Sequence, residues 1–288
     1  MAAQLLDGQK VADEMKAQLA VRVHDLVAKG KKPGLGTILV GDDASSARYV
    51  AMKHKDCEEV GIASFHRHLP ADTSQDQLNS VIDEFNQNGD IDAYLIQLPL
   101  PKHLDEVTSL MRVDPDKDVD GLHPVNLGKL VMGAEGPLPC TPNGILALLS
   151  HFGVKTERSR VVIVGRGLTI GRPLSLLLTL KRPGCNATVT VVHTGTDDIG
   201  AFTREADIVI AAAGQAHLIK GSMVRPGAAV VGAGTTFVNG KLLSDLDDDV
   251  AEVAGWVTPR IGGVGPMTRA MLLVNTVLAA ERHYGKDR

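Results

Sequence analysis

Short apolar runs alternate with helix-forming segments along almost the whole of this 288-residue sequence. The runs GLGTILVG, IASFHRHL and DAYLIQLPLP lie in the first half, and SRVVIVGRG, TVTVVHT, ADIVIAAAG and AAVVGAG lie in the second. This alternation predicts an α/β fold, in which crossover helices join parallel strands. Aromatic residues are only 3% of the chain, so aliphatic side chains must fill the core, as is typical of parallel sheets.

The periodicity also predicts where the helices and the domain connection lie. Helical spacing covers residues 9–29, the segment from Tyr49 to Gly61, QLNSVIDEFNQNG, ILALLSHFG and a final helix between Pro266 and Gly285. Residues 112–144 are instead rich in Asp, Pro and Gly and show little periodicity. This segment predicts loops and a connection between two domains.

Charge and cysteine content exclude several classes of protein. The net charge of −4 lacks the basic footprint of a nucleic-acid-binding protein. The three cysteines are far apart and form no C-x-x-C pair, which argues against a disulfide framework or a zinc knuckle, so we expect no metal. The N-terminus lacks the apolar core of a signal peptide, and no run approaches the roughly 20 apolar residues of a membrane span. We therefore expect a soluble, cytoplasmic protein.

The stretch RVVIVGRGLTIGRP predicts a dinucleotide site. An apolar strand leads into Gly165, Gly167 and Gly171, and a helix-compatible LSLLL follows. Glycines let the backbone approach a pyrophosphate, whose charge is stabilised at a helix N-terminus. The spacing is G-x-G-x-x-x-G rather than G-x-G-x-x-G, and a plain tight turn would contain the same glycines. The strand before and the helix after favour the dinucleotide site.

The next strand favours NADP over NAD. An NAD site usually has an acidic residue at the end of this strand, for the ribose 2′-hydroxyl. TVTVVHTGT has His193 and Thr194 there, and the first acid, Asp197, comes several residues late. The guanidinium of Arg166, in the glycine loop, is able to meet a 2′-phosphate. The alternative is that these are merely polar loop residues.

Four polar residues in the first half are candidates for a reactive site. Tyr49 and Lys53 are four residues apart, so they share one face of a helix. Gln97 ends the strand in YLIQLPLP, and Asp120 lies in KDVDGLHP. A lysine whose pKa is lowered by burial moves protons near neutral pH. Each also has a plain structural interpretation: half-buried core for Tyr49, a solvated charge for Lys53, a strand-end amide for Gln97 and a turn for Asp120.

Six motifs, in order along the chain, carry a resemblance to a known family. They are Y-V-x-x-K at 49–53, QLPLP at 97–101, DKDVDG at 116–121, PCTPNG at 139–144, GRGLTIGRP at 165–173 and GGVGPMT at 262–268. Together they extend over essentially the whole chain. The sequence resembles the bifunctional methylenetetrahydrofolate dehydrogenase/methenyltetrahydrofolate cyclohydrolase family, known in bacteria as FolD.

The resemblance implies a folate-binding catalytic α/β domain formed by residues 1–120 and 266–288, an NADP-binding Rossmann domain formed by residues 121–265, and a cleft between them. It implies NADP-dependent oxidation of 5,10-methylenetetrahydrofolate to the 5,10-methenyl compound. Hydrolysis to 10-formyltetrahydrofolate would follow at the same site. It also implies tetrahydrofolate derivatives as partners, and a homodimer.

The resemblance also implies roles for single residues. Lys53 is the general acid/base of the hydrolytic step, Gln97 tunes it, and Asp120 binds the pterin ring. Tyr49 stacks on the folate. The folate pocket is walled by Gly262, Gly263 and Pro266. The cofactor side is formed by Thr141, Gly165, Arg166, Gly167, Gly171, His193 and Thr194.

The chain departs from the family pattern at three places. Gly167 stands where most members have Ser. VVGAGTT at 230–236 replaces the usual D-V-G-I-N, so that Val231 replaces the acid. Ile261 replaces the proline before the glycine pair. None of these changes touches the proton-transfer set of Lys53, Gln97 and Asp120.

Two other functions compete with this one. A different NADP-dependent oxidoreductase, such as a shikimate-type dehydrogenase, would explain GRGLTIG but leaves QLPLP and GGVGPMT without a purpose. A catalytically silent nucleotide-binding protein would fit the altered VVGAG loop, but it has no need of a proton-transfer set. Neither alternative predicts tight folate binding.

Overall fold

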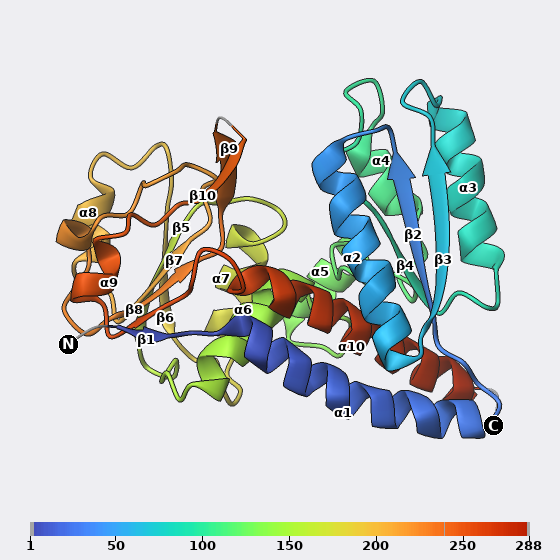
Figure 1. The fold of residues 1–288 in the computed structure, drawn as a ribbon, viewed down its shortest axis with the longest axis horizontal. Helices are drawn as coiled ribbons and strands as arrows, with labels where there is room; N and C mark the ends of the chain where they lie inside the picture. The colour runs from blue at the N-terminus through green and yellow to red at the C-terminus, as the bar shows by residue number, and fades with distance from the viewer. Residues whose placement is uncertain (1–2, 239, 287–288) are drawn as a thin grey trace. The chain divides into compact units, whose positions relative to one another are not determined.

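The computed structural model describes residues 3–238 and 240–286, and its elements are labelled in Figure 1. Two separate parallel sheets organise the chain into two units, as the sequence predicts. The three-stranded unit comprises residues 13–129, 135–140 and the chain from Arg269 onward. The six-stranded unit comprises the chain up to Ala12, residues 130–134 and residues 141–268. The boundary falls inside α1 (Gly8–Ala28) and α10 (Val264–Lys286), so each of these helices contributes residues to both units.

The three-stranded unit is built on β2 (Gly34–Val40), β3 (Ala63–Leu69) and β4 (Ala93–Ile96), which are parallel and in the order β3-β2-β4. Helix α2 (Ala44–Val60) joins β2 to β3, and α3 (Gln75–Gln87) joins β3 to β4. The two helices lie on opposite faces of the sheet (Figure 1), as right-handed crossovers in opposite directions require. Every residue of the central strand β2 is buried. The carboxyl ends of the strands meet at one edge, where α/β proteins bind ligands.

Local sequence sets the ends of these helices. The carboxylate of Asp43 caps α2 by accepting a hydrogen bond from the Ser46 N–H at 2.7 Å. Ser74 and Gln77 form a reciprocal capping box at the start of α3. Helix α2 ends at Val60, with Gly61 as its C-terminal cap, as predicted.

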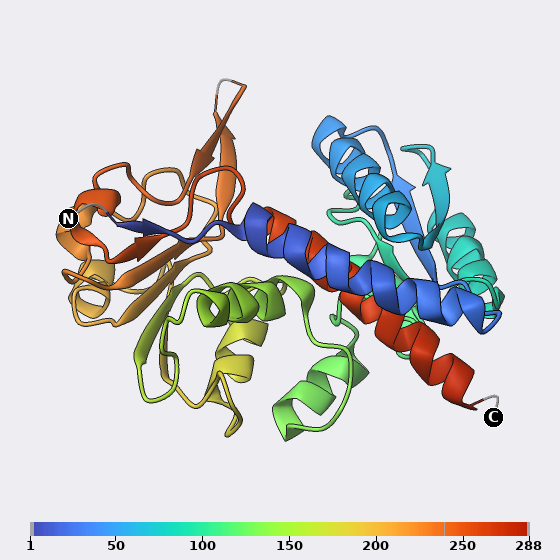
Figure 2. The ribbon, with the colours of Figure 1, turned by 60° about the horizontal axis from the view of Figure 1, so that its bottom comes forward.

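Ion pairs hold α1 and α10 in the three-stranded unit, and Figure 2 shows the two helices alongside each other. Arg22 of α1 pairs with Glu281 of α10 at 2.7 Å. The fully buried carboxylate of Asp92 accepts a hydrogen bond from the Gly34 N–H at 2.9 Å. It also pairs with Lys31 at 2.9 Å and with His283 of α10 at 3.1 Å. One buried carboxylate therefore joins the segment after α1, the start of β2 and α10.

The six-stranded unit carries one parallel sheet in the order β1-β11-β8-β7-β5-β6. In chain order its strands are β1 (Gln4–Leu5), β5 (Arg160–Val164), β6 (Thr188–Val192), β7 (Ile208–Ala211), β8 (Ala229–Gly232) and β11 (Trp256–Val257). Its helices are α6 (Cys140–His151), α7 (Gly171–Thr179), α8 (Ile199–Thr203), α9 (Val250–Val253) and the 3₁₀ turn η1 (Gly221–Met223). Strands β9 (Thr235–Val238) and β10 (Lys241–Ser244) form a separate antiparallel hairpin. The aliphatic residues of β5, β7 and β8 supply much of the core.

Two features differ from the sequence prediction. The segment 112–144, predicted as loops, contains α5 (Pro124–Met132) and the start of α6, after the short helix α4 (Glu106–Arg112). Pro124 is the first residue of α5. The N–H of a first helical residue makes no hydrogen bond within the helix, so proline, which has no N–H, is tolerated there. The N-terminal strand β1 pairs with β11, so the chain up to Ala12 belongs with the six-stranded sheet. A strand of two residues is too short to show a periodic pattern.

Within the described part of the chain, none of the helices combines the length and the apolar character needed to cross a membrane.

Candidate active site

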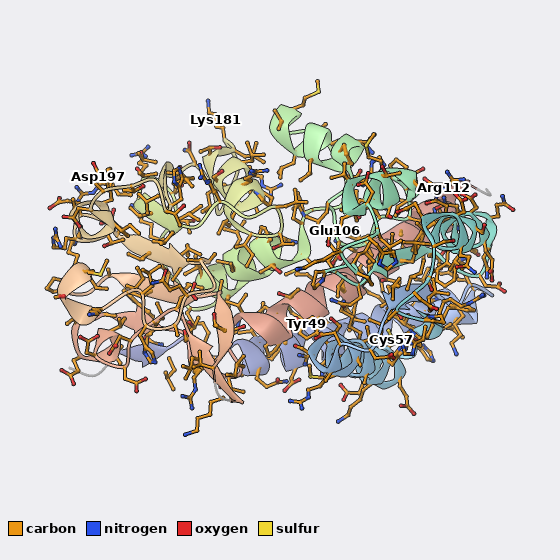
Figure 3. The ribbon with its side chains drawn as sticks, turned by 90° about the horizontal axis from the view of Figure 1, so that it is seen from above. Tyr49, Cys57, Glu106, Arg112, Lys181 and Asp197 are labelled. Atoms are coloured by element: carbon orange, nitrogen blue, oxygen red, sulfur yellow. The ribbon has the colours of Figure 1, made fainter. Side chains whose placement is uncertain are left out.

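Lys53 lies on the buried side of α2, with only 4% of its surface exposed. The buried stripe of this helix recurs at helical spacing, at Ser46, Val50, Lys53, Cys57 and Val60. A lysine therefore occupies a position where an apolar side chain would be expected. Its Nζ lies 5.2 Å from the ring centroid of the half-buried Tyr49, one turn earlier. Tyr49 and Cys57 are labelled on this helix in Figure 3.

Gln97 follows β4 directly and holds the lysine amine. Its main-chain N–H donates to the Ile38 carbonyl at 2.8 Å and so continues the sheet. Its side-chain Nε2 donates to the Leu98 carbonyl at 2.8 Å, which fixes the orientation of the amide. The remaining amide atom, Oε1, accepts a hydrogen bond from Lys53 Nζ at 3.0 Å. The end of β4 thus positions the lysine through one oriented amide.

Asp120 lies in a loop that another aspartate holds in place. The buried carboxylate of Asp118 accepts hydrogen bonds from the N–H groups of Gly121 at 3.1 Å and His123 at 2.8 Å. The Asp120 carbonyl accepts a hydrogen bond from the Cys140 N–H at 3.2 Å. The turn-forming carboxylate in DKDVDG is therefore Asp118. The half-buried Asp120 carboxyl instead acts on the charge of Lys53.

Burial governs the electrostatics of this cluster. It lowers the pKa of Lys53, because the charged ammonium is destabilised away from water. The Asp120 carboxyl and the Cys140 thiol oppose this shift of the Lys53 pKa, whereas the Arg269 guanidinium adds to it. Burial also raises the pKa of Asp120, and Lys53 partly counteracts that rise. The pKa values of Lys53 and Asp120 are thus shifted toward each other, as in sites that move protons.

An ion network one turn further along α2 is not predicted from the sequence. Asp56 is 5% exposed and accepts hydrogen bonds from Arg269 Nε at 2.5 Å and from Lys16 Nζ at 3.2 Å. Arg269 directly follows the GGVGPMT motif but lies 213 residues from Asp56 in the chain. No local pattern joins residues that far apart.

Cys140 is a second unpredicted neighbour of Lys53. Its thiol donates to the Val119 carbonyl at 3.2 Å and accepts from Asn275 Nδ2 at 3.4 Å. Burial raises the pKa of Cys140 well above its usual range, so the thiol stays neutral and packs as a small polar group. Its place in PCTPNG is the one sequence signal that points to it.

In the six-stranded unit, the glycine loop leaves no room for side chains at two positions. A Cβ on Gly165, where φ is +123°, would lie 2.2 Å from the Ala212 carbonyl oxygen. A Cβ on Gly171 would lie 2.2 Å from the Gly165 carbonyl oxygen. Strand β5 and helix α7 therefore meet at the close range that a dinucleotide loop needs. Gly167 has open space where a Cβ would be, so packing does not require a glycine there.

Arg166, in the glycine loop after β5, contacts His193, which directly follows β6. His193 Nδ1 accepts a hydrogen bond from the Gly195 N–H at 3.0 Å. His193 Nε2 lies 3.2 Å from Arg166 Nη1. Thr194, which directly follows His193, is exposed beside this contact. A guanidinium is a group that donates well to phosphate oxygens.

The remaining predicted residues lie around the starts of α6 and α10. Thr141 Oγ1 and Thr268 Oγ1 are hydrogen-bonded at 3.0 Å. In the Gly262–Gly263 pair, the first carbonyl accepts a hydrogen bond from the Gln9 N–H at 2.8 Å. Pro266 is buried in the first turn of α10. The Gly262 carbonyl thus connects the glycine pair to the first turn of α1.

The predicted residues thus fall into two groups, one in each unit. The three-stranded unit brings together Tyr49, Lys53, Gln97 and Asp120. The six-stranded unit holds Thr141, Gly165, Arg166, Gly167, Gly171, His193, Thr194, Gly262, Gly263 and Pro266. In residues 3–238 and 240–286, no three His, Cys, Asp or Glu side chains are grouped as metal ligands would be.

The two remaining departures from the family pattern occupy contrasting environments. Val231 is fully buried in β8, in register with Ile210 of β7, so it serves the core. Ile261 is 73% exposed, so little of its apolar surface is buried. A buried acid does lie close to the altered loop: Asp245 accepts hydrogen bonds from three consecutive N–H groups, at residues 213–215, at 2.7 to 3.0 Å.

Comparison with known proteins covers both units. Residues 6–120 match the catalytic domain of tetrahydrofolate dehydrogenase/cyclohydrolase, and residues 139–284 match the NAD(P)-binding domain of the same family. The sequence is 56% identical over 281 residues to the bifunctional protein FolD of Syntrophotalea carbinolica, covering 98% of this chain and 97% of that protein. The structure is similar to that of the bifunctional enzyme FolD from Campylobacter jejuni, with a TM-score of 0.94, 40% identity and coverage of 98% and 100%. It is also similar to FolD of Trypanosoma brucei in complex with NADP cofactor and inhibitor, with a TM-score of 0.93, 38% identity and 99% of each chain covered.

Proposed function

The chain belongs to the tetrahydrofolate dehydrogenase/cyclohydrolase family, and we propose that Lys53 carries the hydrolytic half of its chemistry. It is a bifunctional enzyme of one-carbon metabolism. It oxidises 5,10-methylenetetrahydrofolate with NADP⁺, and it hydrolyses the resulting 5,10-methenyltetrahydrofolate to 10-formyltetrahydrofolate. The observation that supports the role of Lys53 is its burial: the residue is only 4% exposed, and burial lowers its pKa. Its amine is hydrogen-bonded to Gln97.

Hydrolysis needs a base, because water loses a proton as its oxygen bonds to the positively charged methenyl carbon. Neutral Lys53 takes that proton at Nζ, and Gln97 Oε1 holds the amine in place. The bond from this carbon to N5 then breaks, and Lys53 returns its proton to N5. The remaining hydroxyl proton leaves to solvent as the formyl group forms on N10. One proton is released overall, and the amine is regenerated.

Tyr49 and Asp120 bind the substrate in this scheme. The half-buried ring of Tyr49 offers an aromatic face on which the folate stacks. The Asp120 carboxyl accepts hydrogen bonds from N–H groups of the pterin ring. Because Asp120 also acts on the charge of Lys53, substrate binding at Asp120 is coupled to the protonation of the base. Gly262, Gly263 and Pro266 belong to the folate-binding set as well.

The residues of the six-stranded unit fit NADP. When bound, NADP⁺ takes up the hydride that leaves the methylene carbon. Gly165 and Gly171 let the backbone approach the pyrophosphate at the start of α7, with Gly167 between them. Arg166 and His193 would hold the 2′-phosphate, and Thr194 directly follows His193 in the chain. Thr141 completes the cofactor-binding set.

This assignment divides the functions between the parts of the chain. Folate binding belongs mainly to residues 1–120 and 266–288, and NADP binding belongs to residues 121–265, except that Gly262 and Gly263 at the end of this range are assigned to the folate. The segment up to Ala12 adds to the NADP-binding sheet through β1. We also infer a cytoplasmic homodimer without nucleic-acid or membrane partners. The net charge of −4 supports the absence of a nucleic-acid partner. Light scattering of the purified protein tests the dimer, and a monomer mass would contradict it.

Lys53→Met tests the central assignment. Methionine fills a similar volume but cannot accept a proton, so we expect cyclohydrolase activity to fall by about 10²-fold or more, while NADP⁺-dependent dehydrogenase activity persists. The assay follows the absorbance of the methenyl compound and of reduced nicotinamide separately. Lys55→Met, at an exposed position of the same helix, is the matched control and should keep both activities. Hydrolysis at the wild-type rate by Lys53→Met would contradict the role of Lys53.

A further inference from the structure

We propose that Arg269 is a positioning residue for hydrolysis: Asp56 holds its guanidinium beside α2, where the fixed positive charge favours the neutral form of Lys53. This inference rests on the proposed role of Lys53 as the base. It concerns a residue of α10 that lies outside the six motifs of the sequence.

Buried contacts fix the position of Arg269. Its Nε donates to Asp56 Oδ2 at 2.5 Å, and the side chains of Arg269 and Asp56 are only 14% and 7% exposed. Lys53 and Asp56 are three residues apart on α2, so they lie on the same face of the helix. The guanidinium is therefore anchored to the residue that lies about one helical turn after Lys53 on α2.

Asp56 does not serve Arg269 alone. The other oxygen of Asp56 pairs with Lys16 Nζ of α1 at 3.2 Å, so one carboxylate is shared between two cations. Burial alone would lower the pKa of Lys16, but Glu59, Asp13 and Asp56 together raise it. Lys16 therefore stays charged throughout the physiological range, and it divides its contacts between Glu59 at 2.6 Å, Asp13 at 3.2 Å and Asp56.

Arg269 opposes the groups that favour a charged Lys53. After burial, the groups that act on the Lys53 pKa are Asp120 and Cys140, which raise it, Arg269, which lowers it, and Cys57, which raises it. On α2, His54 adds no fixed charge, since burial, His66 and Lys53 all lower its pKa. Among these described groups, Arg269 is the cation that counters Asp120.

The expected consequence is a bias in the protonation of the base. Without Arg269, Asp120 would favour the ammonium form of Lys53, and an ammonium cannot take a proton from water. An arginine stays charged at every pH of an enzyme assay, so its bias is constant. A purely structural bond between α2 and α10 would affect stability without moving the pH at which hydrolysis begins.

The experiment measures the pH dependence of kcat for hydrolysis of 5,10-methenyltetrahydrofolate, after subtraction of the uncatalysed rate. In Arg269→Gln, and in the double variant Asp56→Asn/Arg269→Gln, we expect the midpoint of the rising limb to move to higher pH by on the order of half a unit to one unit. Arg269→Lys keeps the charge and should keep the wild-type midpoint. The dehydrogenase kcat should stay within about twofold of wild type in all three variants.

The double variant separates two explanations of a shift. If only Arg269→Gln moves the midpoint and the double variant does not, an uncompensated Asp56 carboxylate is the cause and the proposal is overturned. The matched control is Arg22→Gln, which breaks another arginine–carboxylate pair on α10, with Glu281 at 2.7 Å. An equal shift in Arg22→Gln would assign the effect to helix packing and would also overturn the proposal.

Lys53→Met keeps this inference distinct from the proposed function. If Lys53→Met loses hydrolysis and the Arg269 variants keep the wild-type midpoint, the positioning role of Arg269 is contradicted, while the role of Lys53 as the base stands. If Lys53→Met hydrolyses at the wild-type rate, the base has been misassigned. If Arg269→Gln does not fold, Arg269→Lys and the double variant, which keeps the charges balanced, still carry the comparison.

Discussion

Two basic side chains of this enzyme lie in opposite environments: Lys53 is buried and Arg166 is exposed. Lys53 is buried on α2, so its ammonium is destabilised and its pKa is lowered. Arg166 lies exposed in the glycine loop, 3.2 Å from His193 Nε2. Burial gives the first residue a proton-accepting amine, whereas exposure keeps the second available for an anion.

Arg166→Gln tests the phosphate site. A hydrogen bond to a charged group contributes about 1.5 to 3 kcal/mol, so we expect kcat/KM for NADP⁺ to fall by roughly ten- to a hundredfold. NAD⁺ lacks the 2′-phosphate, and its kcat/KM should change little. Steady-state kinetics with both nucleotides measures the ratio. Arg160→Gln, at the opposite end of β5, is the control and should leave both values unchanged. Equal losses with NADP⁺ and NAD⁺ would argue against a 2′-phosphate contact.

At the scale of elements, the backbone segments of the β5–α7 connection lie so close together that two of its positions have no room for a side chain. The Gly171 Cα faces the Gly165 carbonyl so closely that an added methyl group would sit 2.2 Å from its oxygen, whereas at Gly167 it would meet open space. We expect Gly171→Ala to push α7 away from β5, weaken NADP⁺ binding by about tenfold or more, and lower Tm. Gly167→Ala should leave Tm nearly unchanged. Fluorescence titration and thermal unfolding measure the pair, and an unchanged Kd and Tm in Gly171→Ala would refute the packing argument.

The elements that could be predicted from the sequence are those whose pattern is local. The α2 face shared by Tyr49 and Lys53, and the glycine turn after β5, follow from spacing within a few residues. Helix α5 could not be predicted, because its nine residues include a proline and a glycine and follow a loop-like composition. The bond between Asp56 and Arg269 is invisible for a different reason: α2 and α10 come together only in the folded chain.

At the scale of the whole molecule, α1 and α10 each contribute residues to both units. Helix formation is cooperative, so loss of structure at one end of such a helix is expected to spread along it. Asp92 ties these helices into the three-stranded unit through Lys31, just after α1, and through His283 of α10. Its carboxylate is fully buried and also accepts a hydrogen bond from the Gly34 N–H. The stability of the chain should depend on this one group more than on exposed ion pairs.

Asp92→Asn should therefore lower the free energy of unfolding by about 3 kcal/mol, because breaking a buried ion pair leaves its partner uncompensated. The single tryptophan, Trp256, lies in β11 of the six-stranded unit and reports on the unit that does not contain Asp92. We expect urea unfolding followed by Trp256 fluorescence and by far-UV circular dichroism to shift together, because the shared helices couple the units. Asp83→Asn, which breaks an exposed pair with Arg112, should cost less than about 1 kcal/mol. A Trp256 transition that stays in place while the dichroism transition moves would mean that the two units unfold independently, despite the helices they share.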